Sequence, residues 1–172
     1  ITGAGPIGLM AISICNFVGA RNVVITDVNE YRLDLAREMG ATKAINVRNN
    51  SIAEFFPELN MKSGFDVGLE MSGASEALID IVSNMYHGGK IALLGLIPNT
   101  TQINWDSIIF KGLTVKGIYG REMYETWYKM TQMLRSGLNV SKIVTHKLPV
   151  NEYEKAFSIV ESGECGKVIM VW

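Results

Sequence analysis

Residues 1–10 read ITGAGPIGLM, with three glycines directly before an apolar run. Gly3, Gly5 and Gly8 have the spacing G-x-G-x-x-G, which is typical of a turn between a strand and a helix in dinucleotide-binding domains. Gly3 would allow the tight turn, and Gly5 would let the backbone approach a pyrophosphate. Gly8 would let the helix pack closely against the sheet. The stretch therefore predicts a phosphate-binding loop.

The two residues between the second and third glycines lead into the predicted helix. Pro6 suits the first helical turn, where no backbone N–H is needed, and Ile7 follows it. The start of such a helix directs free N–H groups and the positive end of its dipole at the phosphates. We expect the five residues Gly3, Gly5, Pro6, Ile7 and Gly8 to contact the cofactor.

An acidic residue follows at the distance that this type of domain requires. Asp27 lies 19 residues beyond Gly8, at the end of the next β-branched run. A carboxylate there can accept both ribose hydroxyls of the adenosine half, and it would repel a 2′-phosphate, so we predict NAD rather than NADP. The alternative is an ordinary glycine-rich turn with Asp27 capping a loop. Arg32 is predicted to steady the adenosine ribose or stack near adenine, with a solvated arginine as the alternative.

Short apolar runs alternate with helical patterns along the chain. Most runs are nearly continuous in apolar character, as in strands that are covered on both faces. We predict an α/β fold, a doubly wound parallel sheet of the Rossmann type with helices on both faces. Counting the strand before Gly3 as the first, the expected order is 3-2-1-4-5-6. The runs are Asn22–Asp27, Lys43–Val47, Phe65–Met71, Lys90–Leu96, Leu113–Tyr119 and Lys167–Trp172.

The helices between the runs have recognisable ends and faces. Asn29 and Ser75 are predicted to cap the second and third helices, and the third is expected to stop at Gly88. A long helix is expected from Met123 to Arg135. The first helix is predicted to bury a stripe at three- and four-residue spacing. That stripe is Ile7, Met10, Ile14 and Val18.

The composition excludes several classes of protein. The net charge of −1 gives no electrostatic reason to expect nucleic acid or an anionic membrane as a partner. No apolar run reaches the ~18 residues of a membrane span. Cys15 and Cys165 are too few for a disulfide framework or a four-ligand zinc site. We expect a cytoplasmic protein.

The glycine loop comes unusually early in the chain. Only Ile1 and Thr2 precede it, whereas a strand typically has ~5–6 residues. A central strand this short would leave its neighbours partly unpaired. We therefore expect a piece of a longer protein. Residues 1–140 would form the NAD-binding domain with a truncated first strand, and residues 141–172 a return segment that packs with a preceding domain.

Several stretches resemble the zinc-dependent medium-chain alcohol dehydrogenases: GAGPIGLMA, VVITDVNEYRLDLAREMGAT, GFDVGLEMSG and the tail from Val144. The most specific one, GIYGREMYETWY at residues 117–128, resembles the branch that oxidises L-threonine. The resemblance implies an enzyme that converts L-threonine to 2-amino-3-ketobutyrate with NAD. It implies that catalytic zinc lies in the preceding domain, so that this chain holds NAD but has no catalytic residue or metal ligand.

The resemblance also implies contacts at the nicotinamide end of NAD and an oligomer. The oligomer would form through the edge of the sixth strand, and it is a tetramer in the family. Glu70, at the end of an apolar run, is expected to make structural hydrogen bonds, with a chemical role as the alternative. Arg121 is expected either to reach the cofactor or a neighbouring subunit, or to be an ordinary charge at the start of a helix. The implied nicotinamide contacts are Met71, Ser72, Gly73, Leu94, Leu96, Ile118 and Tyr119.

Two other functions remain open from the sequence. One is the NAD-binding domain of a related polyol or butanediol dehydrogenase, because the substrate pocket would lie mostly outside this chain. The other is a non-catalytic nucleotide-sensing module. A segment like residues 141–172 is unusual in such modules and favours the enzymes.

Overall fold

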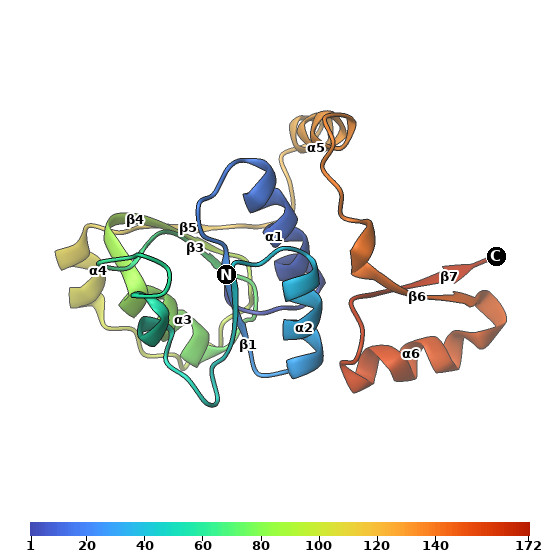
Figure 1. Cartoon of the computed structure of the whole chain (residues 1–172), viewed down its shortest axis with the longest axis horizontal. Helices are drawn as coiled ribbons and strands as arrows, with labels where there is room; N and C mark the ends of the chain where they lie inside the picture. The colour runs from blue at the N-terminus through green and yellow to red at the C-terminus, as the bar shows by residue number, and fades with distance from the viewer.

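The computed structural model describes all 172 residues. Helices and strands alternate as far as residue 135, and a smaller unit follows (Figure 1). The helices are α1 (Pro6–Phe17), α2 (Glu30–Glu38), α3 (Ser75–Asn84), α4 (Trp105–Lys111), α5 (Glu125–Arg135) and α6 (Tyr153–Ser162), with 3-10 turns η1 (Ile52–Phe55), η2 (Ser141–Ile143) and η3 (Val150–Glu152). The strands are β1 (Val24–Asp27), β2 (Lys43–Asn46), β3 (Phe65–Glu70), β4 (Met85–Leu93), β5 (Thr114–Gly117), β6 (Val144–Pro149) and β7 (Lys167–Val171).

Every named strand pair is parallel. β1 pairs with β2, and β4 lies between β3 and β5. Thr2 bridges Thr26 of β1 on one side and Glu70 of β3 on the other. The backbone N–H of Thr2 donates to Leu69 O at 2.9 Å, so the first residues join the two groups of strands. The α/β class is confirmed. The full strand order stays a prediction, because its first strand is represented only by the bridges of Thr2.

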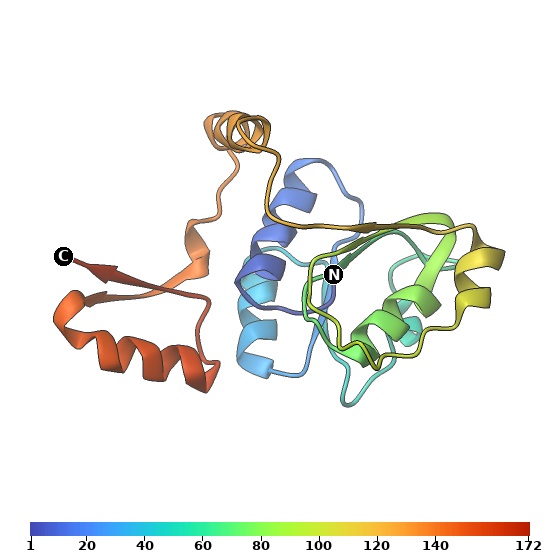
Figure 2. The same ribbon diagram turned by 180° about the vertical axis from the view of Figure 1, so that it is seen from behind.

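Two apolar cores separate the helices onto opposite faces of the sheet. In the first, Leu9 and Ile12 of α1 and Leu33 of α2 pack against Ile25 of β1. In the second, α3 packs on β3 and β4, with Ile81 and Ile91 among its buried members. Figure 2 shows the same division, with α1 and α2 on one side of the strands and α3 on the other. This layering holds the carboxyl ends of the strands along one edge.

The predicted buried stripe of α1 is wrong at three of its four residues, and only Met10 is partly buried and packs against the first core. The buried residues of this helix are Gly8, Leu9 and Ile12, whereas Ile14 and Val18 are exposed, and Ile7 is 45% exposed. The helix is apolar around most of its circumference, so its spacing alone does not select the face that meets the sheet. The close contact of Gly8 with the loop selects that face instead, and it directs Ile7 outward.

Both ends of α3 differ from the predictions, whereas the start of α2 agrees with them. Asn29 caps α2 as predicted, because its Oδ1 accepts from the backbone N–H of Arg32 at 3.2 Å. Ser75 does not cap α3: Ala74 holds the cap position, and the Ser75 hydroxyl lies 2.7 Å from the Thr101 hydroxyl. α3 ends at Asn84 rather than Gly88, because β4 already begins at Met85.

Other strands and helices also begin or end at residues that differ from the predictions. β4 ends at Leu93 instead of Leu96, and β6 was not predicted as a strand. α5 begins two residues later than expected, at Glu125, and it has no buried residue. No helix of the structure has both the length and the apolar character needed to cross a membrane.

Residues 141–172 form a unit of their own beside α2. β6 and β7 pair in parallel and α6 packs on them, on the side of the molecule away from α3 and α4 (Figures 1 and 2). This unit is joined to the α2 region by side-chain contacts. Lys142 Nζ donates to Glu38 O at 2.9 Å, and Arg32 Nε donates to Gly163 O at 3.2 Å.

Candidate functional site

The glycine loop leaves the sheet and becomes α1 within three residues. Gly3 has a φ of +89°, a conformation that favours glycine, and its N–H donates to Thr26 O at 2.8 Å. Gly5 holds the cap position of α1 without any side-chain cap, and Pro6 is the first helical residue. The first N–H groups of a helix have no partner within it, so this end of α1 offers donors to an anion.

The second and third glycines meet different surroundings. A Cβ on Gly8 would lie 1.9 Å from Gly3 O, so a side chain there cannot fit beneath the loop. A Cβ on Gly5 would meet nothing within 4 Å, so this position faces open space. The two surroundings fit the roles predicted for these residues: Gly8 closes the loop against the helix, and Gly5 leaves room for a ligand.

Asp27 connects the end of β1 to the glycine loop. Its Oδ2 accepts from the backbone N–H of Ala4 at 2.6 Å. Its Oδ1 accepts from the N–H groups of Val28 and Asn29 at 2.7 and 2.9 Å. The carboxylate is therefore fixed beside the loop, and Oδ2 keeps acceptor capacity for a further donor such as a ribose hydroxyl.

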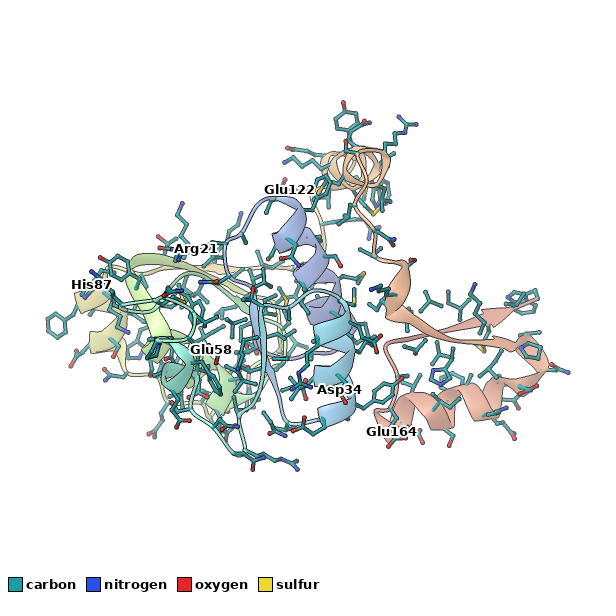
Figure 3. All side chains as sticks on the ribbon, in the orientation of Figure 1. Arg21, Asp34, Glu58, His87, Glu122 and Glu164 are labelled. Atoms are coloured by element: carbon teal, nitrogen blue, oxygen red, sulfur yellow. The ribbon has the colours of Figure 1, made fainter.

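The structure gives Arg32 a contact that its sequence position did not suggest. Its Nε and the Nδ2 of Asn29 both donate to Gly163 O, at 3.2 and 3.3 Å. The side chain thus joins α2 to the turn between α6 and β7. Figure 3 shows this turn, marked by Glu164, beside the first turn of α2. A role of Arg32 at the adenosine ribose stays a prediction.

The residues predicted for the nicotinamide end all follow strand ends at the same edge of the sheet. Met71, Ser72 and Gly73 follow β3, and Leu94 and Leu96 follow β4. The loop after β3 touches the loop after β4, because a Cβ on Gly73 would lie 3.1 Å from Leu96 O. The side chains of Leu96 and Tyr119 are almost fully exposed, at 94% and 102%. Ile118 is held to the sheet by the bond from its N–H to Leu93 O at 2.8 Å.

Glu70 makes the structural hydrogen bonds that the sequence predicts. It is completely buried at the end of β3. Its Oε1 accepts from Ser72 N at 2.8 Å and from Gly73 N at 2.9 Å. Its Oε2 is buried without a hydrogen-bond partner. The sequence signal that marks it is a charged residue at the end of an apolar run, directly before Met71–Ser72–Gly73.

A cavity lies elsewhere in the molecule. It has a volume of about 360 Å³ and is lined by Val23, Val24, Phe65 and Val67, at the amino ends of β1 and β3. Ligands of open parallel sheets collect at the carboxyl ends, so we place the site at the glycine loop and not in this cavity. No three His, Cys, Asp or Glu side chains come together in a way that could hold a metal ion, so the residues present do not fit zinc.

The chain is similar in sequence and in fold to known dehydrogenases. An L-threonine 3-dehydrogenase of Burkholderia thailandensis is 60% identical over the whole chain, which spans about half of that protein's length. Among solved structures, an alcohol dehydrogenase of Thermus sp. ATN1 is 27% identical with a TM-score of 0.86, over 99% of this chain and 50% of its own. The 2R,3R-butanediol dehydrogenase of Bacillus subtilis is 23% identical with a TM-score of 0.86, over 98% of this chain and 49% of its own, a likeness of fold alone.

The model of one protein family covers most of the chain. Its description is zinc-binding dehydrogenase, and it matches residues 6–136, from the first residue of α1 to the residue after α5. The matched range contains Gly8, Asp27 and the loops after β3, β4 and β5. The chain therefore belongs to the zinc-binding dehydrogenase family.

Proposed function

We propose that this chain is the NAD-binding part of an enzyme that oxidises L-threonine at its 3-hydroxyl to 2-amino-3-ketobutyrate. The observation that carries the cofactor assignment is the bond from Ala4 N–H to Asp27 Oδ2, at 2.6 Å. It supports the proposal because the Asp27 carboxylate lies directly beside the glycine loop. The substrate is supported by the 60% identity to a protein named L-threonine 3-dehydrogenase.

Each part of the site has a defined task in this proposal. The start of α1 and the open space at Gly5 hold the pyrophosphate. Asp27 accepts the hydroxyls of the adenosine ribose, with Arg32 nearby. Pro6, Ile7 and the loops after β3, β4 and β5 hold the nicotinamide half, mostly through backbone groups. Bound NAD supplies the acceptor for the hydride that leaves the substrate.

The catalytic groups are proposed to lie outside this chain. Residues 141–172 are proposed to return to that catalytic part, and residues 1–140 to form the NAD-binding domain. The support is the apolar surface of the return segment: Val171 is 53% exposed, and Phe157 and Val160 are exposed as well. Such a surface is typical of an interface.

An oligomer and a cytoplasmic location complete the proposal. β5 pairs only with β4, and all four of its residues are exposed, so its other edge is free to pair with a second copy. Trp105, Ile109 and Phe110 of the adjacent α4 add exposed apolar surface. The cytoplasm is supported by two cysteines that are both free thiols.

Calorimetric titration with NAD and NADP tests the cofactor assignment. The protein should bind NAD more tightly, because the Asp27 carboxylate repels a 2′-phosphate. Equal affinities would contradict the role given to Asp27. The full-length protein should reduce NAD with L-threonine and not with 2,3-butanediol; the opposite preference would favour a butanediol dehydrogenase.

A further inference from the structure

One buried carboxylate fixes the turn that follows β3. Glu70 Oε1 accepts from the backbone N–H groups of Ser72 and Gly73, from the Ser72 hydroxyl at 2.5 Å, and from the Thr2 hydroxyl at 3.4 Å. Donors from the turn and from the N-terminal segment thus meet at one oxygen. Because four donors meet at this oxygen, it holds the turn and the N-terminal segment together.

The same residue also fixes the loop after β4. The backbone O of Glu70 accepts from Leu94 N–H at 3.0 Å and from Gly95 N–H at 3.2 Å. Its unpaired Oε2 lies against Gly95, where a Cβ would be 2.3 Å from that oxygen and 2.3 Å from Gly73 N. The two loops can approach this closely only because Gly95 has no side chain.

Fold stability does not explain a carboxylate at this point. Burying a carboxylate is costly even when it is paired, and an apolar side chain of similar volume is often as stable or more so. Glu70 keeps one oxygen without a partner while it holds two loops that both belong to the proposed nicotinamide side. The hydrogen bonds of Asp27, on the adenosine side, go to Ala4, Val28 and Asn29 and do not involve Glu70.

We propose that Glu70 is a positioning residue for the nicotinamide half of the cofactor. It shapes the loops at Ser72–Gly73 and Leu94–Leu96, and it makes no hydrogen bond to the groups that hold Asp27 on the adenosine side. This inference rests on the proposed binding of NAD.

The substitution Glu70→Gln separates the two halves of the cofactor. Glutamine keeps one acceptor oxygen, but its amide NH₂ must face either the N–H donors of the turn or Gly95. We expect the affinity for NADH to fall about tenfold, the typical effect of one buried hydrogen bond lost at a charged acceptor. The affinity for ADP-ribose, which lacks nicotinamide, should stay the same. Both are measured by calorimetry, with the fluorescence of bound NADH as a second readout of the nicotinamide environment.

A matched control and a second variant keep the test decisive. Glu76→Gln removes the same charge from an exposed position on α3 and should leave both affinities unchanged. Ser72→Ala removes the hydroxyl that donates to Glu70 and accepts from Ala74 N–H at 3.1 Å, and it should weaken the binding of NADH more than that of ADP-ribose. If Glu70→Gln does not fold, Ser72→Ala decides the question.

The outcomes distinguish this inference from the proposed function. An equal loss of NADH and ADP-ribose binding, or no loss in folded variants, would overturn the role of Glu70. If the unsubstituted protein binds neither ligand, the NAD assignment itself fails. A selective loss of NADH binding supports both the role of Glu70 and the assignment of NAD.

Discussion

The backbone N–H of Ala4 donates to Asp27 Oδ2 at 2.6 Å, so the residue that is proposed to bind the ribose also holds the glycine loop. The other oxygen of Asp27 accepts from Val28 and Asn29. Three backbone donors from two loops therefore converge on one side chain. This coupling implies that changes at Asp27 affect the loop as well as cofactor choice.

Asp27→Asn should lower the affinity for NAD and reduce the preference for NAD over NADP. The new NH₂ group must face either Ala4 N–H or the N–H groups of Val28 and Asn29, so at least one hydrogen bond is lost. The loss of a partner for a partly buried donor costs about 1–3 kcal/mol, or roughly tenfold in affinity. Titration of both cofactors measures the change. An unaltered ratio of the two affinities would show that Asp27 does not select the cofactor.

Gly5→Ala and Gly8→Ala should separate binding from folding. A Cβ at position 8 would lie 1.9 Å from Gly3 O, and overpacking against backbone costs about 3 kcal/mol of unfolding free energy. A Cβ at position 5 meets nothing within 4 Å, and the φ of −70° there suits alanine. Gly5→Ala should therefore unfold at the same urea concentration as the unsubstituted protein. It should bind NAD more weakly, because the methyl group would occupy the space proposed for the pyrophosphate. Equal stability losses for both variants would contradict this division.

The local part of the site could be predicted from the sequence. The spacing of Gly3, Gly5 and Gly8 and the position of Asp27 follow from rules about neighbouring residues, and the parallel α/β class follows from the alternation of strands and helices. The cap at Asn29 obeys such a rule too. The rule for capping residues fails at Ser75. This residue is the first of α3 rather than its cap, and its hydroxyl bonds to that of Thr101.

The remaining features depend on contacts between distant parts of the chain. Glu70 gains its importance from Thr2, Ser72 and Gly95, which the sheet brings together. The buried face of α1 depends on how Gly8 rests on the loop. Arg32 reaches Gly163, a residue 131 positions away. Neither the periodicity of the sequence nor the spacing of its residues predicts these contacts, and only the structure reveals them.

Arg32→Met should loosen the unit formed by α6 and β7. Its Nε donates to Gly163 O, and this bond contributes about 1 kcal/mol. Hydrogen exchange at the turn around Gly163 should become faster, while exchange in β3 and β4 should not change. Arg21→Met is the matched control, because Arg21 is exposed and lies away from this unit in Figure 3. Unchanged exchange at the turn would mean that other contacts hold the segment.

Asp80→Asn should stabilise the protein at neutral pH. Burial, and next the charge of Glu76 one turn earlier on α3, raise the pKa of Asp80 above its usual value. The folded protein therefore binds this proton more tightly than the unfolded chain does. The ionised Asp80 lowers stability as pH rises through the raised pKa, and the penalty is absent below the unfolded pKa of ~3.9.

Removing the charge of Asp80 should raise the free energy of unfolding by about 0.5 kcal/mol at neutral pH, the typical size of a like-charge pair on a helix. Urea unfolding measures the effect, and the gain should vanish when both proteins are compared at a pH of ~3, below the unfolded pKa. Glu76→Gln removes only the second cause, so its gain at neutral pH should be smaller. A gain that persists in acid would assign the stabilisation to the amide itself and not to the lost charge.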